Sequence, residues 1–208
     1  MNKKPTHRPG RSGPRLTSAT EKGQTPPEVS VPTFAGNVAP AMPRGRFICG
    51  DLDIRIDREG VWYYHGSPIG RKELVCLFAS VLTRAEDGSY WLVTPAEMGR
   101  VEVEDVPFMA VELFVNGCGR EQKLSMRTNV DEIVSVDDDH PLTITSNPAT
   151  EEPLPYVAVR DSMNARLSRS VYYQLVALGV EEKIDDDPIF GVWSCGSFFP
   201  MGRLSDEP

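Results

Sequence analysis

Short runs of alternating apolar and polar residues dominate the chain after residue 46. Ile54 and Ile56 alternate with Arg55 and Asp57, which is the period of a half-buried strand. The aromatic run at 61–65 follows a Gly-containing turn and predicts a returning strand. The same pattern predicts short strands within 89–95, 100–108, 109–117, 122–129, 133–138, 141–146, 155–160 and 189–201.

Two segments instead have the three-and-four spacing of an amphipathic helix. The first follows Ser67 and Pro68, where Ser67 is a candidate N-cap, and its apolar positions are Leu74, Leu77, Phe78, Val81 and Leu82. The second is predicted to run from Ser162 to Leu178, with Asp161 or Ser162 as the N-cap and Gly179 as the stop signal. Its apolar stripe is Leu167, Val171, Leu175 and Leu178.

The order of these elements repeats along the chain. Residues 51–105 and 140–201 each read as a hairpin, a helix and a strand pair, although sequence identity between them is weak. Few strands alternate singly with helices, which argues against a doubly wound parallel sheet. We therefore predict an α+β fold of two packed domains, at 46–105 and 106–203, each with curved antiparallel sheet and one main helix.

Charge separates a basic N-terminal segment from an acidic body. Residues 1–45 contain seven Lys or Arg and two Glu, a formal charge of +5. Because the whole chain has a formal charge of −8, the remaining residues carry −13. Their Pro and Gly content and scarcity of large apolar residues predict a disordered tail. A basic arm for nucleic acid is the alternative. An acidic body repels phosphate backbones and anionic lipid, so the folded part is not expected to bind nucleic acid or membrane.

The cysteines and the hydropathy bear on the cellular location of the protein. No apolar run reaches the roughly 20 residues that a membrane helix needs. The N-terminus lacks the apolar segment of a secretory signal, so we expect a cytoplasmic protein. The four cysteines contain no C-x-x-C pair and are expected to be thiols, with two disulfides as the alternative.

The acidic run Asp137–Asp138–Asp139–His140 raises the question of a metal site. On a strand these four side chains alternate between two faces, so they do not converge on one ion. The sixth residue from Asp137 is Leu142, where a calcium loop needs Gly. We expect a polar turn before Pro141, and we predict neither a metal nor a cofactor.

No nucleophile or phosphate-loop motif appears. Ser194 and Gly191 are wrongly spaced for a nucleophile elbow. Arg side chains near turns and strand ends, beside amide and hydroxyl groups, are more informative, because a guanidinium matches two oxygens of a phosphate or carboxylate. They are Arg55, Arg71, Arg127, Arg160, Arg166 and Arg169. The alternative is that each Arg pairs with a nearby acid and that the aromatic residues fill the core.

From Cys49 onward the chain resembles a bacterial family of uncharacterised proteins, domain of unknown function 1285. The blocks that carry the resemblance include CGDLDIRIDREGVWYYHGSPIGRKELVCLFASVL, VEDVPFMAVE, RTNVDE, PYVAVR and FGVWSCGSFFPMG. The resemblance implies a duplicated core, a second domain similar to pleckstrin-homology-like barrels, and a nucleotide-like ligand in the groove between domains, with a role in signalling or stress response. The polar candidates within the matching blocks are Arg55, Trp62, Arg71, Thr94, Arg127, Asn129, His140, Arg160 and Arg169.

Three functional hypotheses follow. The first is a binding module without enzymatic activity, which holds a small anion such as a nucleotide by Arg side chains and an aromatic face. The second is a protein-interaction scaffold that docks a protein partner through strand edges or the tail. The third is a hydrolase or transferase that uses His140 with the acids of 131–139. We expect the first.

Overall fold

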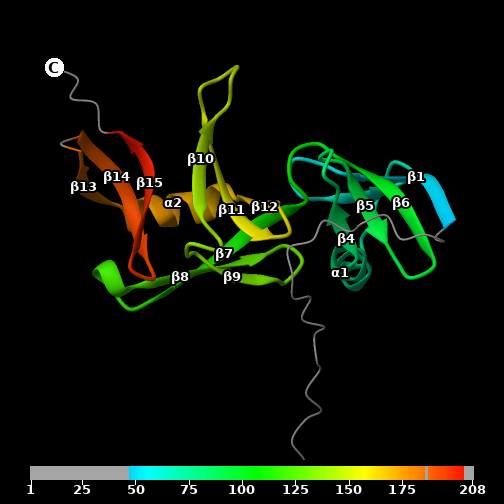
Figure 1. Ribbon diagram of the computed structural model, residues 1–208, viewed down its shortest axis with the longest axis horizontal. Helices are drawn as coiled ribbons and strands as arrows, with labels where there is room; N and C mark the ends of the chain where they lie inside the picture. The colour runs from blue at the N-terminus through cyan, green and yellow to red at the C-terminus, as the bar shows by residue number, and fades with distance from the viewer. Residues whose placement is uncertain (1–46, 186, 204–208) are drawn as a thin grey trace, which may run out of the picture. The chain divides into compact units, whose positions relative to one another are not determined.

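The computed structural model describes residues 47–185 and 187–203, with the backbone alone described for Phe47–Cys49. These residues belong to one compact unit. They form three sheets and two α-helices (Figure 1). The predicted disordered tail, residues 1–45, lies outside the described residues.

The first sheet has six strands in the order β3-β2-β1-β6-β5-β4. The strands are β1 (Phe47–Ile56), β2 (Trp62–Tyr64), β3 (Ser67–Pro68), β4 (Leu82–Arg84), β5 (Tyr90–Val93) and β6 (Glu97–Val103), and α1 (Lys72–Ser80) connects β3 to β4. The β1–β2 turn forms because Asp57 Oδ1 accepts the amides of Glu59 and Val61, at 3.0 and 2.8 Å. Gly60 completes this turn at φ +75°, where a side chain would be strained.

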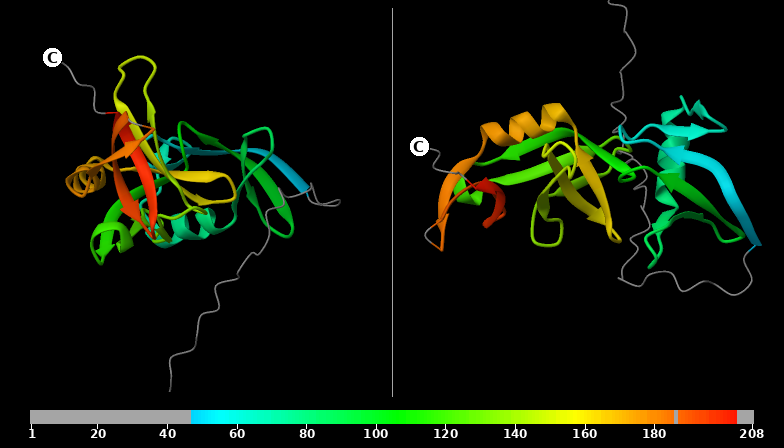
Figure 2. Two further views of the ribbon diagram at one scale, coloured as in Figure 1. Left: turned by 60° about the vertical axis from the view of Figure 1, so that its left-hand side comes forward. Right: turned by 90° about the horizontal axis from the view of Figure 1, so that it is seen from above.

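The second sheet also has six strands, in the order β10-β11-β12-β7-β8-β9. They are β7 (Phe108–Asn116), β8 (Lys123–Thr128), β9 (Ile133–Ser135), β10 (Leu142–Ser146), β11 (Pro153–Arg160) and β12 (Met163–Leu167). The helix α2 (Arg169–Ala177) follows β12 and lies along β7 (Figure 2, right). It buries Val171 and Leu175.

The third sheet is β13 (Val180–Ile184), β14 (Asp187–Ser194) and β15 (Ser197–Arg203), all antiparallel. A short 3-10 helix, η1 (Gly119–Glu121), lies in the β7–β8 connection against β14. The turn of the β14–β15 hairpin bonds to this connection, because the amides of Cys195 and Gly196 donate to the carbonyls of Gln122 and Arg120. Two parts of the chain about 75 residues apart in sequence are thereby held together.

The predicted repeat is present at the level of elements. Three strands, a helix and three strands occur first in β1–β6 with α1 and again in β10–β15 with α2. The two copies differ in how their last strands pair. In the first copy the last strand, β6, pairs in parallel with β1 and completes one sheet. In the second, β12 pairs in parallel with β7, and β13–β15 form a separate sheet. The expectation of purely antiparallel sheets is therefore corrected by these two parallel pairs.

The predicted second helix is wrong in its first half. Residues 163–167 form β12, where Met163, Ala165 and Leu167 are buried at alternate positions, which is the period of a strand. Asp161 and Ser162 do not cap a helix, because both have positive φ in the tight turn between β11 and β12. The helix begins at Arg169, and Ser168 is its N-cap, accepting the amide of Val171.

The first helix also begins later than predicted. Ser67 and Pro68 form β3, and α1 starts at Lys72 with Arg71 in the N-cap position. The strand β13 was not predicted, because its sequence, VEEKI, is polar and four of its five residues are exposed. The strand pair around Gly196 agrees with β14 and β15.

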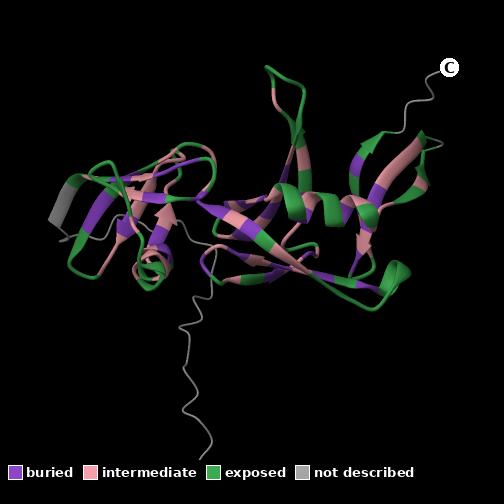
Figure 3. Cartoon of the chain, turned by 180° about the vertical axis from the view of Figure 1, so that it is seen from behind, coloured by how far each residue is buried: buried purple, intermediate pink, exposed green. Residues whose placement is uncertain are grey.

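The core residues lie mainly on the strands, whereas the outer side of α2 and the tips of several hairpins are exposed (Figure 3). Trp62, Phe108, Ile56, Leu124 and Met126 are the largest fully buried side chains. Cys76, Cys118 and Cys195 are free thiols. Among the described residues, neither helix has the length and apolar character needed to cross a bilayer.

Candidate functional site

The predicted candidates on the first sheet are dispersed. Arg55 on β1 forms an ion pair with Glu104 and lies over the Tyr63 ring, 4.3 Å from its centroid. Trp62 is a core residue, 1% exposed, and its ring stacks on Phe78. Thr94 stabilises a turn, because its hydroxyl accepts the Glu97 amide and donates to the Glu97 carbonyl, both at 3.0 Å. These three side chains serve the local structure.

Asn129 belongs to the Thr128–Glu132 turn, between β8 and β9, which contacts the β1–β2 turn. Its side-chain amide donates to the Gly60 carbonyl at 2.8 Å, and its Oδ1 accepts the Met109 amide at 3.0 Å. The same turn reaches α1, because Asp131 accepts from Lys72 Nζ at 2.7 Å. The side chain of Asn129 therefore holds three backbone segments together.

Arg127 and Arg160 lie on either side of this turn, and acids neutralise both. Arg127 bonds to Glu112 at 2.7 Å and to Asp131 at 2.8 Å. The hydrogen bonds from Lys72 and Arg127 hold the pKa of the Asp131 carboxyl below its usual range. Arg160 donates to the Ala79 carbonyl at 2.6 Å and pairs with Glu132 at 3.7 Å. The structure thus brings Arg127, Asn129 and Arg160 together, and each of them bonds within the chain. Arg160 Nε is nevertheless buried without a hydrogen-bond partner among the described residues.

The remaining candidates lie elsewhere. Arg71 is exposed before α1, and Arg169 is exposed at the first position of α2. His140 lies in the bend between β9 and β10, where its Nδ1 is 3.1 Å from Asp137 Oδ1. Asp137 Oδ1 also accepts the amides of Asp139 and His140. Partial burial opposes ionisation here, but the His140 bonds outweigh it and lower the pKa of Asp137.

This geometry gives the acidic run a structural role as a turn. Within residues 47–185 and 187–203, no group of three or more His, Cys, Asp or Glu side chains is arranged to hold a metal ion. Ser194, the hydroxyl considered as a nucleophile, is fully buried. It donates to the Val136 carbonyl at 2.6 Å and accepts the Leu124 amide at 3.0 Å, so both functions of its hydroxyl are used in packing.

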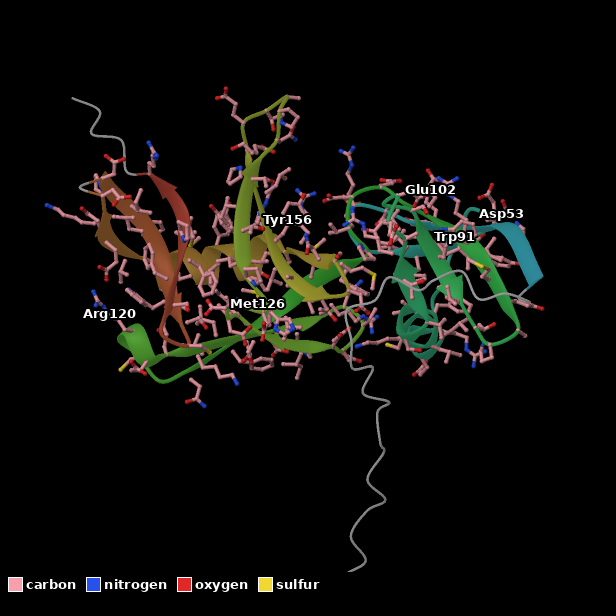
Figure 4. All side chains as sticks on the ribbon, in the orientation of Figure 1. Asp53, Trp91, Glu102, Arg120, Met126 and Tyr156 are labelled. Atoms are coloured by element: carbon pink, nitrogen blue, oxygen red, sulfur yellow. The ribbon has the colours of Figure 1, made fainter. Side chains whose placement is uncertain are left out.

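A polar cluster that the sequence did not reveal surrounds Asp105, in the segment between β6 and β7. The Tyr156 hydroxyl on β11 donates to the Asp105 carboxylate, at 3.0 and 3.1 Å from its two oxygens (Figure 4 labels Tyr156). Arg166, the cross-strand partner of Tyr156 on β12, is 3.4 Å from Asp105 Oδ2. Burial, reinforced by the hydrogen bond to Asp105, raises the pKa of Tyr156 to about 12.

Electrostatic effects link further residues to this carboxylate. The charges of Arg166 and Arg58 both lower the pKa of Tyr156, against the larger effects that raise it. Burial raises the pKa of Tyr90 on β5; Arg84 opposes the rise and Asp105 supports it. Arg84 lies 5.7 Å from the centroid of the Tyr90 ring, and its Nη1 donates to the Ser162 carbonyl at 2.9 Å. We call these six residues the Asp105 cluster: Arg58, Arg84, Tyr90, Asp105, Tyr156 and Arg166.

The Asp105 cluster has the chemistry of an anion site. One phenol, Tyr156, and one guanidinium, Arg166, bond to the Asp105 carboxylate. The charges of Arg58 and Arg84 act on the Tyr156 and Tyr90 phenols, in a chain whose body is otherwise acidic. Arg84 Nε is buried and has no hydrogen-bond partner among the described residues, which leaves one donor unsatisfied. Arg160 Nε and Trp62 Nε1, outside the cluster, are in the same state. Arg166 was noted in the sequence among the Arg residues near strand ends. The others were missed because they come from five separate segments, and no spacing in the sequence connects them.

A hollow with a volume of about 810 Å³ lies beside β1 and β6. It combines acids with bases, and these partly pair with one another: Asp53 and His65 are 3.2 Å apart. Its charged lining residues are Asp51, Asp53, Arg55, His65, Arg100 and Glu102. Three acids face two Arg and one His, so side chains of both signs line the hollow.

The fold is of the α+β class, with curled sheets in two repeated regions. Two family models match consecutive parts of the chain: the N-terminal domain of the DUF1285 family, of unknown function, at 46–106, and its C-terminal domain at 107–201. The chain belongs to the DUF1285 family, as the resemblance in the sequence predicted.

One solved structure supports this membership. A DUF1285 family protein from Silicibacter pomeroyi DSS-3 is 42% identical, with a TM-score of 0.70 over 76% of this chain and 84% of that one. A second, from Shewanella baltica OS155, is 25% identical over 61% of this chain and 91% of that one, with a TM-score of 0.48. No curated protein matches the chain.

Proposed function

We propose that this protein is a binding module, without enzymatic activity, that recognises a small anion of the phosphate class, such as a nucleotide, at the Asp105 cluster. The observation that carries the proposal is the shared Asp105 carboxylate, which bonds to both Tyr156 and Arg166. A carboxylate held by a guanidinium and a phenol has the contacts that a phosphate oxygen would make. The further charges of Arg84 and Arg58 favour an additional anion beside it.

The proposal keeps the anionic ligand expected from the sequence and changes the residues. Arg127, Asn129 and Arg160 remain candidates, but each already bonds within the chain. A ligand there would have to displace Glu112, Asp131 or Glu132. At the Asp105 cluster, one carboxylate bonds to Arg166, and the positive charges of Arg84 and Arg58 act on the neighbouring phenols, so added negative charge is less opposed.

The proposal also covers the domains that contribute the site and the cellular role of the protein. Its residues come from both family regions, since Arg58, Arg84 and Tyr90 precede residue 106 and Tyr156 and Arg166 follow it. We propose domains at 46–105 and 106–203, the second with a pleckstrin-homology-like arrangement of sheet and helix, in a cytoplasmic sensor of signalling or stress. A ligand that contacts residues of both regions would favour one arrangement of them over others, which is the property a sensor needs.

The test is a thermal-shift and calorimetric titration of the full chain with inorganic pyrophosphate and adenosine monophosphate at low ionic strength. A ligand at about 100 times its dissociation constant adds about 2.7 kcal/mol of stability and raises the unfolding midpoint. Arg166→Gln and Arg84→Gln should each weaken binding at least about tenfold, because a charged hydrogen bond contributes about 1.5 to 3 kcal/mol. Arg169→Gln, which removes an exposed charge from α2, is the matched control.

Three results would contradict the proposal. The first is no shift with either anion. The second is an equal shift in wild type and Arg166→Gln. The third is a loss of binding in Arg127→Gln but not in Arg84→Gln, which would move the site to the Thr128–Glu132 turn.

A further inference from the structure

Asn116 and Gly117 lie where β7 ends and the connection to η1 begins. Both residues are exposed, and Gly117 has a φ of +82°. Among the described residues, no hydrogen bond engages the Asn116 side-chain amide or the Gly117 backbone nitrogen. An amide carbon and the backbone nitrogen that follows it are therefore both available, and Gly117 has no side chain to shield that nitrogen.

These two groups can react with each other. The Gly117 nitrogen attacks Cγ of Asn116 and loses its proton, the new N–Cγ bond closes a succinimide ring, and the Cγ–Nδ2 bond breaks to release ammonia. Water then opens the ring. Cleavage at Cγ gives aspartate, and cleavage at the main-chain carbonyl gives isoaspartate. The reaction consumes only water and involves no change of oxidation state.

The pair Asp87–Gly88 is a matched sequence in which the structure opposes the same ring closure. Asp87 is also exposed, but its Oδ1 accepts the amide and the hydroxyl of Ser89, at 2.9 and 2.5 Å. The Gly88 nitrogen donates to the Ala85 carbonyl at 3.0 Å. These hydrogen bonds must break before the two groups can meet, whereas Asn116 and Gly117 have none to break.

The other asparagines in the described part of the chain are also less suited. Asn129 uses both polar atoms of its side chain in hydrogen bonds. Asn147 precedes a proline, whose nitrogen carries no proton. Asn164 precedes Ala165, which is fully buried. We infer that Asn116 is a modification site, at which the chain deamidates spontaneously to aspartate and isoaspartate.

The modification acts on a segment that holds the third sheet. A carboxylate at position 116 lies opposite Lys123, which forms no ion pair with another described residue, and opposite charges on facing strands attract each other. Isoaspartate also adds a methylene group to the backbone, directly before the connection whose Arg120 and Gln122 carbonyls accept amides of the β14–β15 turn. Isoaspartate therefore loosens this attachment, whereas aspartate leaves it intact.

The test is peptide mapping by mass spectrometry of the full chain after incubation at mildly alkaline pH, with and without guanidinium chloride. The wild-type peptide that contains residue 116 should gain the mass of an amide-to-acid conversion, and Asn116→Gln should lose this conversion. Asp87→Asn, which places a second asparagine before glycine, is the matched control. In the folded chain it should convert at least about tenfold more slowly at 87 than at 116, because its hydrogen bonds add to the barrier. In guanidinium chloride the two positions should convert at similar rates.

A folded chain in which residue 116 keeps its amide overturns the inference. So does equal conversion at 87 and 116 in folded Asp87→Asn. Amide hydrogen exchange tests the structural consequence: residues 117–122 and 194–197 should exchange faster in the incubated wild type than in Asn116→Asp, and equal exchange would refute the loosening. These measurements need no anion, so their outcome is independent of the proposed anion site.

Discussion

The Asn129 side-chain amide donates to the Gly60 carbonyl at 2.8 Å, joining the β8–β9 turn to the β1–β2 turn across 69 residues of sequence. The fit is close: a Cβ added at Gly60 would lie 2.9 Å from Asn129 Nδ2. This contact, together with the Lys72–Asp131 and Arg160–Ala79 bonds, connects the two regions that the family models define. Their connection is therefore polar and specific as well as apolar.

Asn129→Ala should lower the free energy of unfolding by about 2 to 3 kcal/mol, because it leaves the Gly60 carbonyl and the Met109 amide without their partner. Urea denaturation followed by tryptophan fluorescence, at low protein concentration, measures this loss. Asn116→Ala, at an exposed position, is the control and should change the free energy by less than about 0.5 kcal/mol. Equal stability of the two variants would contradict the role given to Asn129.

Ser194→Ala should destabilise the protein by about 2 kcal/mol, because the buried hydroxyl serves the Val136 carbonyl and the Leu124 amide. These bonds fasten β14 to β8 and to the end of β9. The control is Ser197→Ala, whose exposed hydroxyl donates to Asp138 and should contribute less than about 1 kcal/mol. Thermal unfolding of both variants gives the comparison, and a larger loss in Ser197→Ala would refute the argument.

Gly191→Ala should destabilise the chain by about 2 to 3 kcal/mol, since an added methyl group in a packed site forces its neighbours apart. The new Cβ would lie 2.4 Å from the Phe199 carbonyl oxygen and 2.5 Å from the Phe198 ring. Gly202→Ala provides a matched control on the adjacent strand, where nothing lies within 4 Å of the added Cβ. Chemical denaturation of the two variants should separate them, and similar midpoints would exclude close packing at Gly191.

Tyr156 should titrate with a pKa of about 12, because burial and the Asp105 hydrogen bond favour its neutral form. The folded state keeps this proton when the unfolded chain loses it near pH 10, so the contribution of Tyr156 to stability falls as pH rises from about 10 to about 12. Phenolate absorbance of wild type minus Tyr156→Phe isolates this group. Asp105→Asn should bring its pKa closer to 10, and a Tyr156 that titrates near 10 in wild type would contradict the observed hydrogen bond.

The elements with a clear period in the sequence were predicted correctly, and those without one were not. Ile54 and Ile56 mark β1 because one face of that strand is buried, and Leu74, Leu77 and Phe78 mark α1. Val81 and Leu82 were assigned to the same helical stripe, but α1 ends at Ser80 and Leu82 begins β4. Residues 163–167 were assigned to the helix because Leu167, Val171 and Leu175 also fit a helical stripe. The positive φ of Asp161 and Ser162, which ends β11 and starts β12, has no signature in residues that are neither Gly nor Asn.

The candidate site was less predictable than the fold. Arg127 and Arg160 stood out in the sequence because they lie beside polar residues, yet their charges are balanced by Glu112, Asp131 and Glu132. Asp105 did not stand out, because it follows two glutamates in an acidic stretch. Its importance comes from Tyr156 and Arg166, which lie more than 50 residues away in the sequence.

The sequence by itself determined the α+β class, the repeated order of elements, the turn at Asp137–His140 and the membership of the DUF1285 family. Local periodicity and turn chemistry depend on neighbouring residues, so the sequence carries them directly. Only the tertiary structure decided which strands pair in parallel, which Arg side chains are neutralised, and which residues gather around Asp105. Those features depend on contacts between distant segments, whose partners are set by packing of the whole chain rather than by any local pattern.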